Sequence, residues 1–271
     1  MQQTRVPASY PSISAPLSGG IPAKAPEIPA RVPEPTPEVR DYERSLARSA
    51  VSRTRTDRPR EFDLRGRQWN LLDEVFCPTY SPSTGIALDF LGWTESWTTP
   101  RRGSMLEIGC GTGVIAVMGA LAGCERVVAS DISPQAVANA RLNAERHGLT
   151  DRVEAVRSDL FDALDPAERF DLVFWSSNYV LAPAGHVYGS VHDMAYVDPG
   201  YAAHRRFLAE APDRLAPGGS ALLHFSSRGD LDALHAMAAE TGRELRTLQS
   251  AVVQEGACPV EHLLLEIVPA A

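Results

Sequence analysis

The sequence predicts an α/β fold with a seven-stranded, mostly parallel sheet, helices on both faces and an antiparallel last strand. First, apolar runs of strand length alternate with helical patterns from Ser104 onward. Near-continuous apolar strands are typical of parallel sheets that are covered on both faces. Second, a glycine-rich loop, residues 109–113, joins the first run to the first helical pattern. Third, only a short turn near Gly256 separates the last two runs, and such a turn joins antiparallel strands.

The N-terminal part predicts two units ahead of this domain. Residues 1–39 contain nine of the 21 prolines, which block helix and sheet, so we expect a disordered tail there. Residues 40–98 predict a helical subdomain that covers the site as a lid and contacts substrate. A helix is expected from about Glu38 to Arg53, followed by an irregular aromatic stretch. Ser81-Pro82-Ser83-Thr84 then predicts a cap, with proline in the first turn of a second helix that runs to about Leu91.

Residues 99–271 are expected to form the catalytic domain. The expected strands are Met105–Ile108, Val127–Ser130, Val153–Val156, Leu172–Trp175, Ala221–Phe225, Leu245–Val253 and Leu263–Val268. The expected helices are Val114–Leu121, Pro134–His147, Tyr201–Leu215 and Asp230–Thr241.

Charge and cysteine content restrict the function. The net charge is −8, and the nine arginines of residues 40–67 are interrupted by five acids, so a solvated helix face is favoured over a nucleic-acid arm. The four cysteines form no pair or cluster at metal-ligand spacing, which predicts reduced thiols, no metal and a cytoplasmic location. No apolar run is long enough to span a membrane, and Met1–Arg5 leads into no secretion signal.

The loop around Gly109 is expected to hold a ligand at the carboxyl end of the first strand. Glu107 lies two residues earlier, and a buried carboxylate there needs a partner such as the cationic end of an amino acid. Asp131 ends the next strand, where it can accept hydrogen bonds from ribose hydroxyls or cap the following helix. The spacing G-x-G-x-G also differs from the dinucleotide pattern G-x-G-x-x-G.

The segment Leu106-Glu107-Ile108-Gly109-Cys110-Gly111-Thr112-Gly113 resembles the first motif of class I S-adenosylmethionine-dependent methyltransferases. Arg157–Leu160 is similar to their adenine site, and Leu215–Gly219 to the turn before their fifth strand. The resemblance implies a Rossmann-like fold with S-adenosylmethionine as cosubstrate. The cofactor-binding residues it implies are Glu107, Gly109, Cys110, Gly111, Gly113, Asp131, Ile132, Asp159, Leu160 and Ser176.

The fourth strand is followed by Ser176-Ser177-Asn178-Tyr179. This segment resembles the Asn-Pro-Pro-Tyr motif of the release-factor glutamine methyltransferases, which hold their target nitrogen there. Ser176 stands at the position of the motif's asparagine, and a hydroxyl lacks the paired donor and acceptor of an amide. Asn178 and Tyr179 are therefore the expected catalytic residues, with Asn178 as a turn cap as the alternative.

Further candidates are less specific. The aromatic residues Trp69, Phe76, Tyr80, Trp175 and Tyr196 are expected to contact substrate, although core packing explains the first four equally well. In the loop after the fourth strand, His186, His192 and Asp193 are candidate bases. His204 is expected on a helix surface.

The favoured function is methyl transfer to a nitrogen or oxygen of a small molecule, either an amino acid or a specialised metabolite. One alternative keeps the cofactor and changes the reaction: the amine of S-adenosylmethionine attacks its own γ-carbon, as in azetidine-2-carboxylate synthases. A second alternative is a non-catalytic regulator that binds S-adenosylmethionine. A small-molecule acceptor is the expected partner, with no nucleic acid and no membrane, and the sequence gives no oligomeric state.

Overall fold

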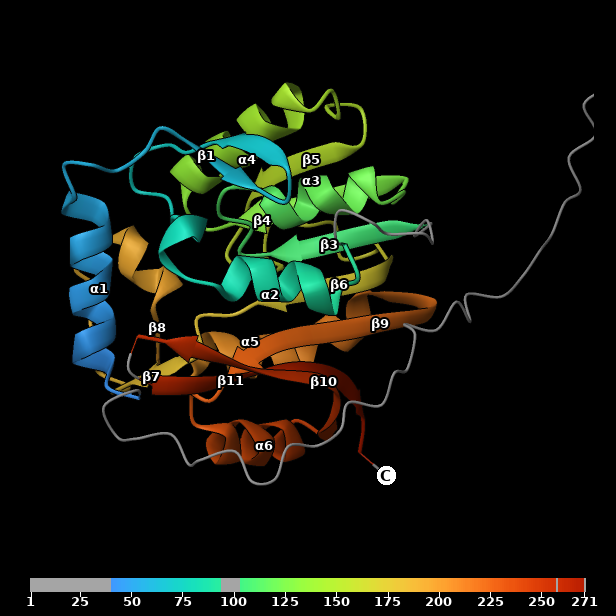
Figure 1. Ribbon diagram of the computed structural model, residues 1–271. Coiled ribbons are helices and arrows are strands. Elements are labelled where there is room, and N and C mark those ends of the chain that lie inside the picture. Colours follow the sequence, from blue (N-terminus) through green and yellow to red (C-terminus); the bar gives the residue numbers. More distant parts are fainter. Residues whose placement is uncertain (1–39, 94–102, 257, 271) are drawn as a thin grey trace, which may run out of the picture.

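The computed structural model describes residues 40–93, 103–256 and 258–270 (Figure 1). The predicted tail, residues 1–39, and the predicted domain boundary at residue 98 lie outside these residues. The main sheet has seven strands in the order β10-β11-β9-β6-β3-β4-β5. Their bounds are β3 (Ser104–Ile108), β4 (Arg126–Asp131), β5 (Val153–Arg157), β6 (Phe170–Ser176), β9 (Leu215–Ser226), β10 (Arg243–Glu255) and β11 (Cys258–Pro269).

The predicted fold is confirmed, including the direction of the last strand. β3, β4, β5, β6 and β9 pair in parallel, whereas β11 is antiparallel to both β9 and β10. The β10–β11 hairpin inserts its second strand next to β9, so β10 forms the edge of the sheet. The largest boundary shifts are at β9, which begins at Leu215 where the sequence had predicted the end of a helix, and at β11, which begins at Cys258 and not at Leu263.

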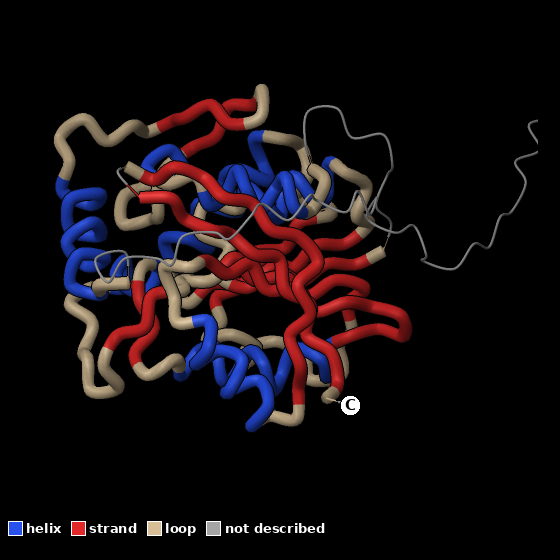
Figure 2. The backbone as a smooth tube through the Cα atoms, turned by 60° about the horizontal axis from the view of Figure 1, so that its bottom comes forward, coloured by secondary structure: helices blue, strands red, loops and turns tan. Residues whose placement is uncertain are grey.

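Helices lie on both sides of the main sheet (Figure 2), and side-chain alternation along the strands divides the core into two layers. On β3, Met105 packs into the layer under α2 (Ser83–Phe90), α3 (Val114–Leu121) and α4 (Pro134–Arg146), and Leu106 faces the opposite layer. That second layer is covered by α5 (Ala202–Glu210) and α6 (Leu231–Glu240). Both faces of the central strands are therefore buried, which explains their uninterrupted apolar sequence.

Two small sheets were not predicted from the sequence. A hairpin joins β1 (Glu61–Leu64) to β2 (Arg67–Asn70), and β7 (Val180–Ala182) pairs in parallel with β8 (Val197–Pro199). The hairpin turn consists of Arg65 and Gly66, both with positive φ. An arginine in a left-handed position is uncommon, so the usual Asn-Gly signal for such a turn is missing.

Helix α1 (Tyr42–Thr54) stands beside the carboxyl ends of the parallel strands (Figure 1). Asp41 caps its first turn by accepting from the N–H groups of Glu43 and Arg44. The buried face of α1 carries serines instead of large apolar residues, and it packs on β7, β8 and a 3₁₀ turn, η2 (Val191–Ala195). Tyr42 and Leu46 also pack on a small apolar cluster around Tyr196, so polar and apolar contacts together hold this helix in place.

Two buried asparagines of α4 attach the N-terminal segment to the glycine loop. Asn143 Oδ1 accepts from the Asn70 N–H at 2.8 Å, and its Nδ2 donates to the Thr112 carbonyl at 2.8 Å. Asn139 Oδ1 accepts from the Leu72 N–H at 2.7 Å. Among the described helices, none is long and apolar enough to cross a membrane.

Replacing Asn143 by alanine should lower the free energy of unfolding by about 1–3 kcal/mol, because buried backbone groups at Asn70 and Thr112 lose their partner. Urea unfolding followed by circular dichroism measures the change. Leu142→Ala, at an exposed position of the same helix, is the control and should change stability little. Equal effects of the two substitutions would show that the asparagine contacts do not hold the subdomain.

Candidate active site

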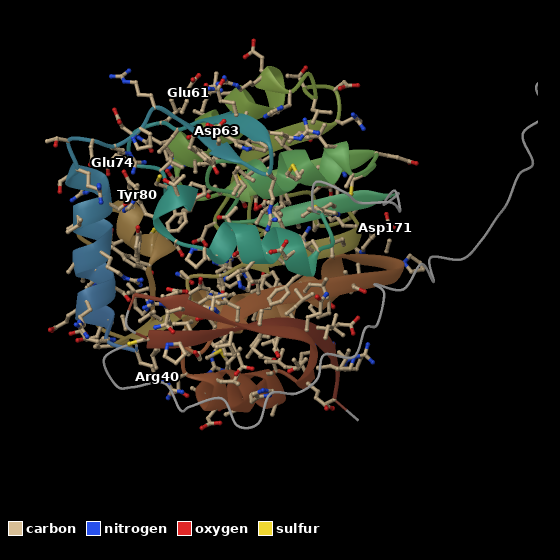
Figure 3. All side chains as sticks on the ribbon, in the orientation of Figure 1. Arg40, Glu61, Asp63, Glu74, Tyr80 and Asp171 are labelled. Atoms are coloured by element: carbon tan, nitrogen blue, oxygen red, sulfur yellow. The ribbon has the colours of Figure 1, made fainter. Side chains whose placement is uncertain are left out.

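A cavity of about 530 Å³ lies at the carboxyl ends of the central strands, beneath α1. One wall is the glycine loop with Asp131 at the end of β4, and a second wall is the segment after β6. α1 and residues 74–84 close the opposite side. Figure 3 shows Glu74 and Tyr80 beside the C-terminal end of α1, with Arg40 at its N-terminal end. Parallel strands deliver their loops to one edge, where ligands bind in open α/β sheets.

The glycine loop requires its glycines for different reasons. Gly109, Gly111 and Gly113 all have positive φ. A Cβ on Gly109 would lie 3.1 Å from Trp175 Nε1, whereas a Cβ on Gly113 would lie 2.6 Å from the Ala140 Cα. Gly109, Cys110 and Gly111 line the cavity, and Gly113 does not. Gly113 therefore allows α3 to approach α4 closely and acts on the ligand site only through the shape of the loop.

Asp131 is positioned by two backbone groups. Its Oδ2 accepts from the Gly111 N–H at 2.9 Å, and its Oδ1 accepts from the Ser133 N–H at 2.9 Å. Burial raises the pKa of the carboxyl group. The cap of α4 is Ser133, which accepts from the Ala136 N–H. Asp131 thus fixes the turn between β4 and α4 and the glycine loop, and each oxygen keeps a free lone pair for a ligand hydroxyl.

Glu107 is buried in β3 without a charged partner among the described residues. The Ala116 N–H donates to the carboxyl group, and Oε2 has no hydrogen-bond partner within the described residues. Burial, followed by the charge of Asp131, raises its pKa well above the usual value. An ammonium group in the cavity would satisfy this carboxylate. Together with the glycine cradle and Asp131, Glu107 fits the amino acid and ribose ends of S-adenosylmethionine.

The expected adenine site lies at the rim of the cavity. Asp159 and Leu160 line it beside Ile132, and Leu160 has a positive φ. Asp159 is half-exposed and its Oδ1 forms an ion pair with Arg206 at 3.1 Å. The expected acceptor oxygen for an adenine amine is therefore Oδ2, while the ion pair orients the carboxylate.

The segment after β6 brings the expected catalytic residues to the cavity wall. Asn178 Nδ2 donates to the carbonyls of Met194 and Val197, both at 2.8 Å, which assigns the amide orientation. Asn178 Oδ1 is buried and has no partner within the described residues. Burial raises the pKa of Tyr179 to about 12. Asn178 is thus anchored through its nitrogen, and its oxygen is an unpaired acceptor at the wall.

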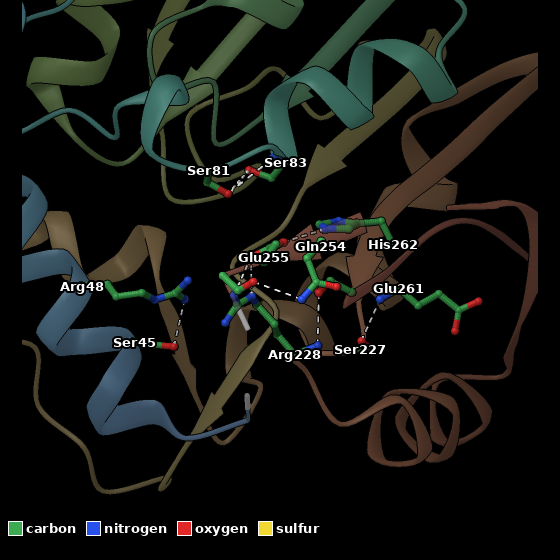
Figure 4. Close-up of polar contacts among 12 residues, drawn as sticks. Ser45, Arg48, Ser81, Ser83, Ser227, Arg228, Gln254, Glu255, Glu261 and His262 are labelled. Carbon is green, nitrogen blue, oxygen red and sulfur yellow. Dashed lines mark hydrogen bonds and ion pairs between the residues drawn. The ribbon is translucent and has the colours of Figure 1, made fainter. Parts of the chain in front are cut away.

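Ser176 begins a buried chain of hydrogen bonds that crosses three strands. Ser176 Oγ lies 2.9 Å from His224 Nδ1, and His224 Nε2 lies 2.9 Å from His262 Nδ1. His262 Nε2 lies 2.9 Å from Glu255 Oε1, and Arg228 Nε donates to Glu255 Oε2 at 2.9 Å (Figure 4). Both ends of the chain, Ser176 and Arg228, line the cavity.

The chain has one order of protons when both imidazoles are neutral. Burial acts to raise the pKa of Glu255, but the hydrogen bond from His262 and the charge and hydrogen bond of Arg228 outweigh it and lower this pKa, so the carboxylate only accepts. His262 Nε2 then carries its proton, His262 Nδ1 accepts from His224 Nε2, and His224 Nδ1 accepts from the Ser176 hydroxyl. Burial and His262 lower the pKa of His224 well below its usual value, which keeps it neutral. Ser176 Oγ is therefore left with lone pairs alone for the cavity.

The structure places the expected aromatic residues differently from one another. Phe76, Tyr80, Trp175 and Tyr196 line the cavity. Trp69 does not: it is fully buried, contacts the ring of His147 in a tilted arrangement and donates to the Leu64 carbonyl. The expectation that Trp69 contacts substrate is wrong, because the hairpin β1–β2 directs it into the core.

The candidate bases differ in whether they line the cavity. His192 lines the cavity and its Nδ1 lies 2.8 Å from Ser49 Oγ, whereas Asp193 and His186 do not line it. Asp193 accepts from Ser49 and from the Ser190 N–H, which fixes η2 against α1. The prediction of His204 on a helix surface is wrong: it is fully buried, 2.6 Å from Asp198, and the tilted ring of Trp175 lies 4.6 Å away between centroids.

The sequence analysis missed five residues of the site. Arg48 and Arg228 line the cavity, and His224, His262 and Glu255 link Ser176 to Arg228. The available signal was His224 and His262 inside the apolar runs of β9 and β11, where a polar side chain needs a partner. Arg48 and Arg228 gave no signal, because the fold alone brings α1 and the segment after β9 to one cavity. Within the described residues, no group of three or more metal-ligating side chains is present.

Stability should fall as the pH drops from about 6.5 to about 4. Burial lowers the pKa of His192 from 6.5 to about 4, so the folded protein keeps it neutral while the unfolded chain takes up a proton. The shift corresponds to about 3 kcal/mol of unfolding free energy, fully present above pH 6.5 and lost toward pH 4. Urea unfolding of wild type and His192→Gln at each pH isolates this contribution.

The difference in unfolding free energy between wild type and His192→Gln should decrease by about 3 kcal/mol as the pH falls from 6.5 to about 4. His235→Gln, exposed on α6, is the control and should follow the wild type. Parallel pH profiles of wild type and His192→Gln would contradict a buried neutral imidazole.

Comparison with known proteins agrees with this fold and site. A methyltransferase domain family matches residues 105–197. The release factor glutamine methyltransferase of Bordetella pertussis is 32% identical over 190 residues, which cover 64% of this chain and 66% of that protein. The ribosomal protein L11 methyltransferase of Vibrio parahaemolyticus is 36% identical over 73 residues, 27% of this chain and 23% of that protein. The match thus spans less than two thirds of either relative.

Solved structures share the fold at low sequence identity. A methyltransferase from Pyrococcus furiosus has a TM-score of 0.51 at 20% identity, covering 83% of this chain and 96% of that one. The 16S rRNA methyltransferase of T. thermophilus, in complex with AdoMet and guanosine, has a TM-score of 0.53 at 22% identity, covering 78% and 50%. With the glycine loop, Glu107 and Asp131 in place, the chain belongs to the class I S-adenosylmethionine-dependent methyltransferase superfamily.

Proposed function

We propose that this protein transfers the methyl group of S-adenosylmethionine to a nitrogen of a small molecule, an amino acid or a specialised metabolite. The observation that carries the proposal is one cavity in which Glu107 and Asp131 share walls with Asn178 and Ser176. Glu107, Asp131 and Asp159 would hold the amino group, ribose and adenine. The bound cofactor supplies an activated methyl carbon, so the protein mainly aligns the nucleophile and excludes water.

Two hydrogen-bond acceptors favour nitrogen over oxygen as the nucleophile. Asn178 Oδ1 and the lone pairs of Ser176 both require hydrogens from the acceptor molecule. A primary amine or amide nitrogen carries two hydrogens, and a hydroxyl carries one. Ser176 thus takes over part of the role of the asparagine in the related Asn-Pro-Pro-Tyr motif, and Asn178 supplies the rest.

The chain of hydrogen bonds also offers a path for the proton that leaves the nitrogen. As the new N–C bond forms and the S–C bond breaks, the nitrogen becomes positively charged. Its proton passes to Ser176 Oγ while the hydroxyl proton moves to His224 Nδ1. The His224 Nε2 proton moves to His262 Nδ1, and the His262 Nε2 proton moves to Glu255. The net result is a neutral methylated nitrogen and a protonated Glu255.

A macromolecular acceptor is the second candidate. The Bordetella pertussis relative is named for a glutamine of a release factor and the Vibrio relative for a ribosomal protein. The small acceptor is favoured because α1 and η2 cover the side of the cavity opposite the sheet. About 530 Å³ must also take the cofactor, and the whole lies within the range of small-molecule sites. None of the matched families or relatives supports the intramolecular cyclisation.

The test is to incubate the full chain with S-adenosylmethionine and identify products by mass spectrometry. One reaction has no acceptor, a second has a pool of amino acids and primary amines, and a third has a glutamine-containing peptide. We expect S-adenosylhomocysteine and a methylated product only with the small-molecule pool. Ser176→Ala should lower the rate at least tenfold without weakening cofactor binding, because it removes one acceptor and breaks the chain.

Each other outcome rejects a distinct part of the proposal. Methylthioadenosine without an acceptor would replace methyl transfer by cyclisation. Methylation of the peptide alone would assign a macromolecular acceptor. Cofactor binding without any product would favour the regulator.

A further inference from the structure

We infer that Arg48 and Arg228 bind a carboxylate of the acceptor, so that its class is a carboxylate-bearing amine or amide such as a free amino acid. The inference rests on the proposed function. It adds a carboxylate as the group of the acceptor that the cavity binds next to α1 and the segment after β9. Both arginines line the cavity, Arg48 from α1 and Arg228 from the segment after β9. Figure 4 shows Arg48 extending from α1 toward Arg228 and Glu255.

Arg48 has no counter-ion of its own. Its Nη2 donates to Ser45 Oγ at 3.3 Å, and its guanidinium lies 6.0 Å from the centre of the Tyr196 ring. Within the described residues it forms no ion pair. Its side chain is exposed on α1 and lines the cavity, and the surrounding protein lowers its pKa, first by desolvation and then by the charge of Arg228. A bound anion would relieve both effects.

Arg228 is oriented but not fully neutralised. Its Nε donates to Glu255 Oε2 at 2.9 Å, and Glu255 also accepts from His262. Arg228 and Glu255 are 13% and 9% exposed, so water screens this pair poorly. Glu255 is thus shared by Arg228 and His262, and it forms no ion pair with Arg48. The cluster retains one net positive charge, which matches a single carboxylate and its two oxygens.

The order of the strands places this cluster at the acceptor end. Asp131 ends β4, the glycine loop follows β3, Ser176 ends β6 and Arg228 follows β9, and these four strands are successive neighbours in the sheet. Arg228 thus lies beyond Ser176 as seen from the ribose residue Asp131, and Arg48 extends toward it from α1 (Figure 4). A molecule with its nitrogen at Ser176 and Asn178 and its carboxylate at the arginines would span this end. The carboxylate of S-adenosylmethionine is the other source of the same chemistry.

The experiment titrates the full chain, saturated with S-adenosylhomocysteine, with the twenty proteinogenic amino acids and their α-carboxamides. Saturation-transfer NMR and calorimetry measure affinity for wild type, Arg48→Gln and Arg48→Lys. At least one amino acid should bind tenfold or more tightly than its carboxamide. Arg48→Gln should abolish that preference, and Arg48→Lys should keep part of it, because the charge remains without the planar fork. Arg44→Gln, exposed on the same helix, should retain it.

Three results would overturn the inference. The first is that no amino acid binds, or that acid and carboxamide bind equally. The second is an unchanged preference in an Arg48→Gln protein that still binds the cofactor. The third is a tenfold loss of S-adenosylmethionine affinity in Arg48→Gln with unchanged affinity for decarboxylated S-adenosylmethionine, which assigns the arginines to the cofactor. Methyl transfer to neutral amines alone would reject this inference and leave the proposed function standing, whereas failure of all transfer would reject the function.

Discussion

The hydrogen-bonded chain from Ser176 to Arg228 is the constraint on which the acceptor side of this site depends. It ties the end of β6 to β9, β11 and the β10–β11 hairpin, and both of its ends reach the cavity. Glu255 fixes its direction, because a carboxylate accepts and cannot donate to an imidazole. The same carboxylate holds Arg228. One buried charge thus sets both the hydrogen-bonding character of Ser176 and the position of the guanidinium at the other end.

The cofactor side follows from local sequence, and for that reason it was predictable. A strand, a loop with three glycines and a helix follow one another directly in residues 104–121, and Asp131 ends the neighbouring strand, so the parallel sheet alone brings them together. Trp69 and His204 could not be placed in this way. The direction of Trp69 depends on a hairpin whose Arg65-Gly66 turn lacks the usual signal, and His204 is buried by a pairing with Asp198 across a turn.

The acceptor side is assembled from segments far apart in the chain. Arg48 comes from the first helix, Ser176 from the middle of the sheet and Glu255 from the last hairpin. No spacing rule links these residues in the sequence. The only indication of a hydrogen-bond network was the pair of histidines, His224 and His262, within apolar strands. The structure also changes the interpretation of Ser176, which stands where the related motif has an asparagine. The hydroxyl lies 2.9 Å from His224 Nδ1, and Asn178 is held through its nitrogen, with its oxygen buried and without a partner among the described residues.

The protonation of the two histidines tests this account most directly. Long-range ¹H–¹⁵N NMR spectra of the protein labelled at histidine nitrogen, at pH 7.5, distinguish protonated from bare ring nitrogens. The account predicts that His224 and His262 both carry their proton on Nε2, with Nδ1 bare, and that Glu255→Gln disturbs this pattern while the fold is retained. A proton on His224 Nδ1 in the wild type would contradict it, because the imidazole would then donate to Ser176 and turn the hydroxyl proton toward the cavity.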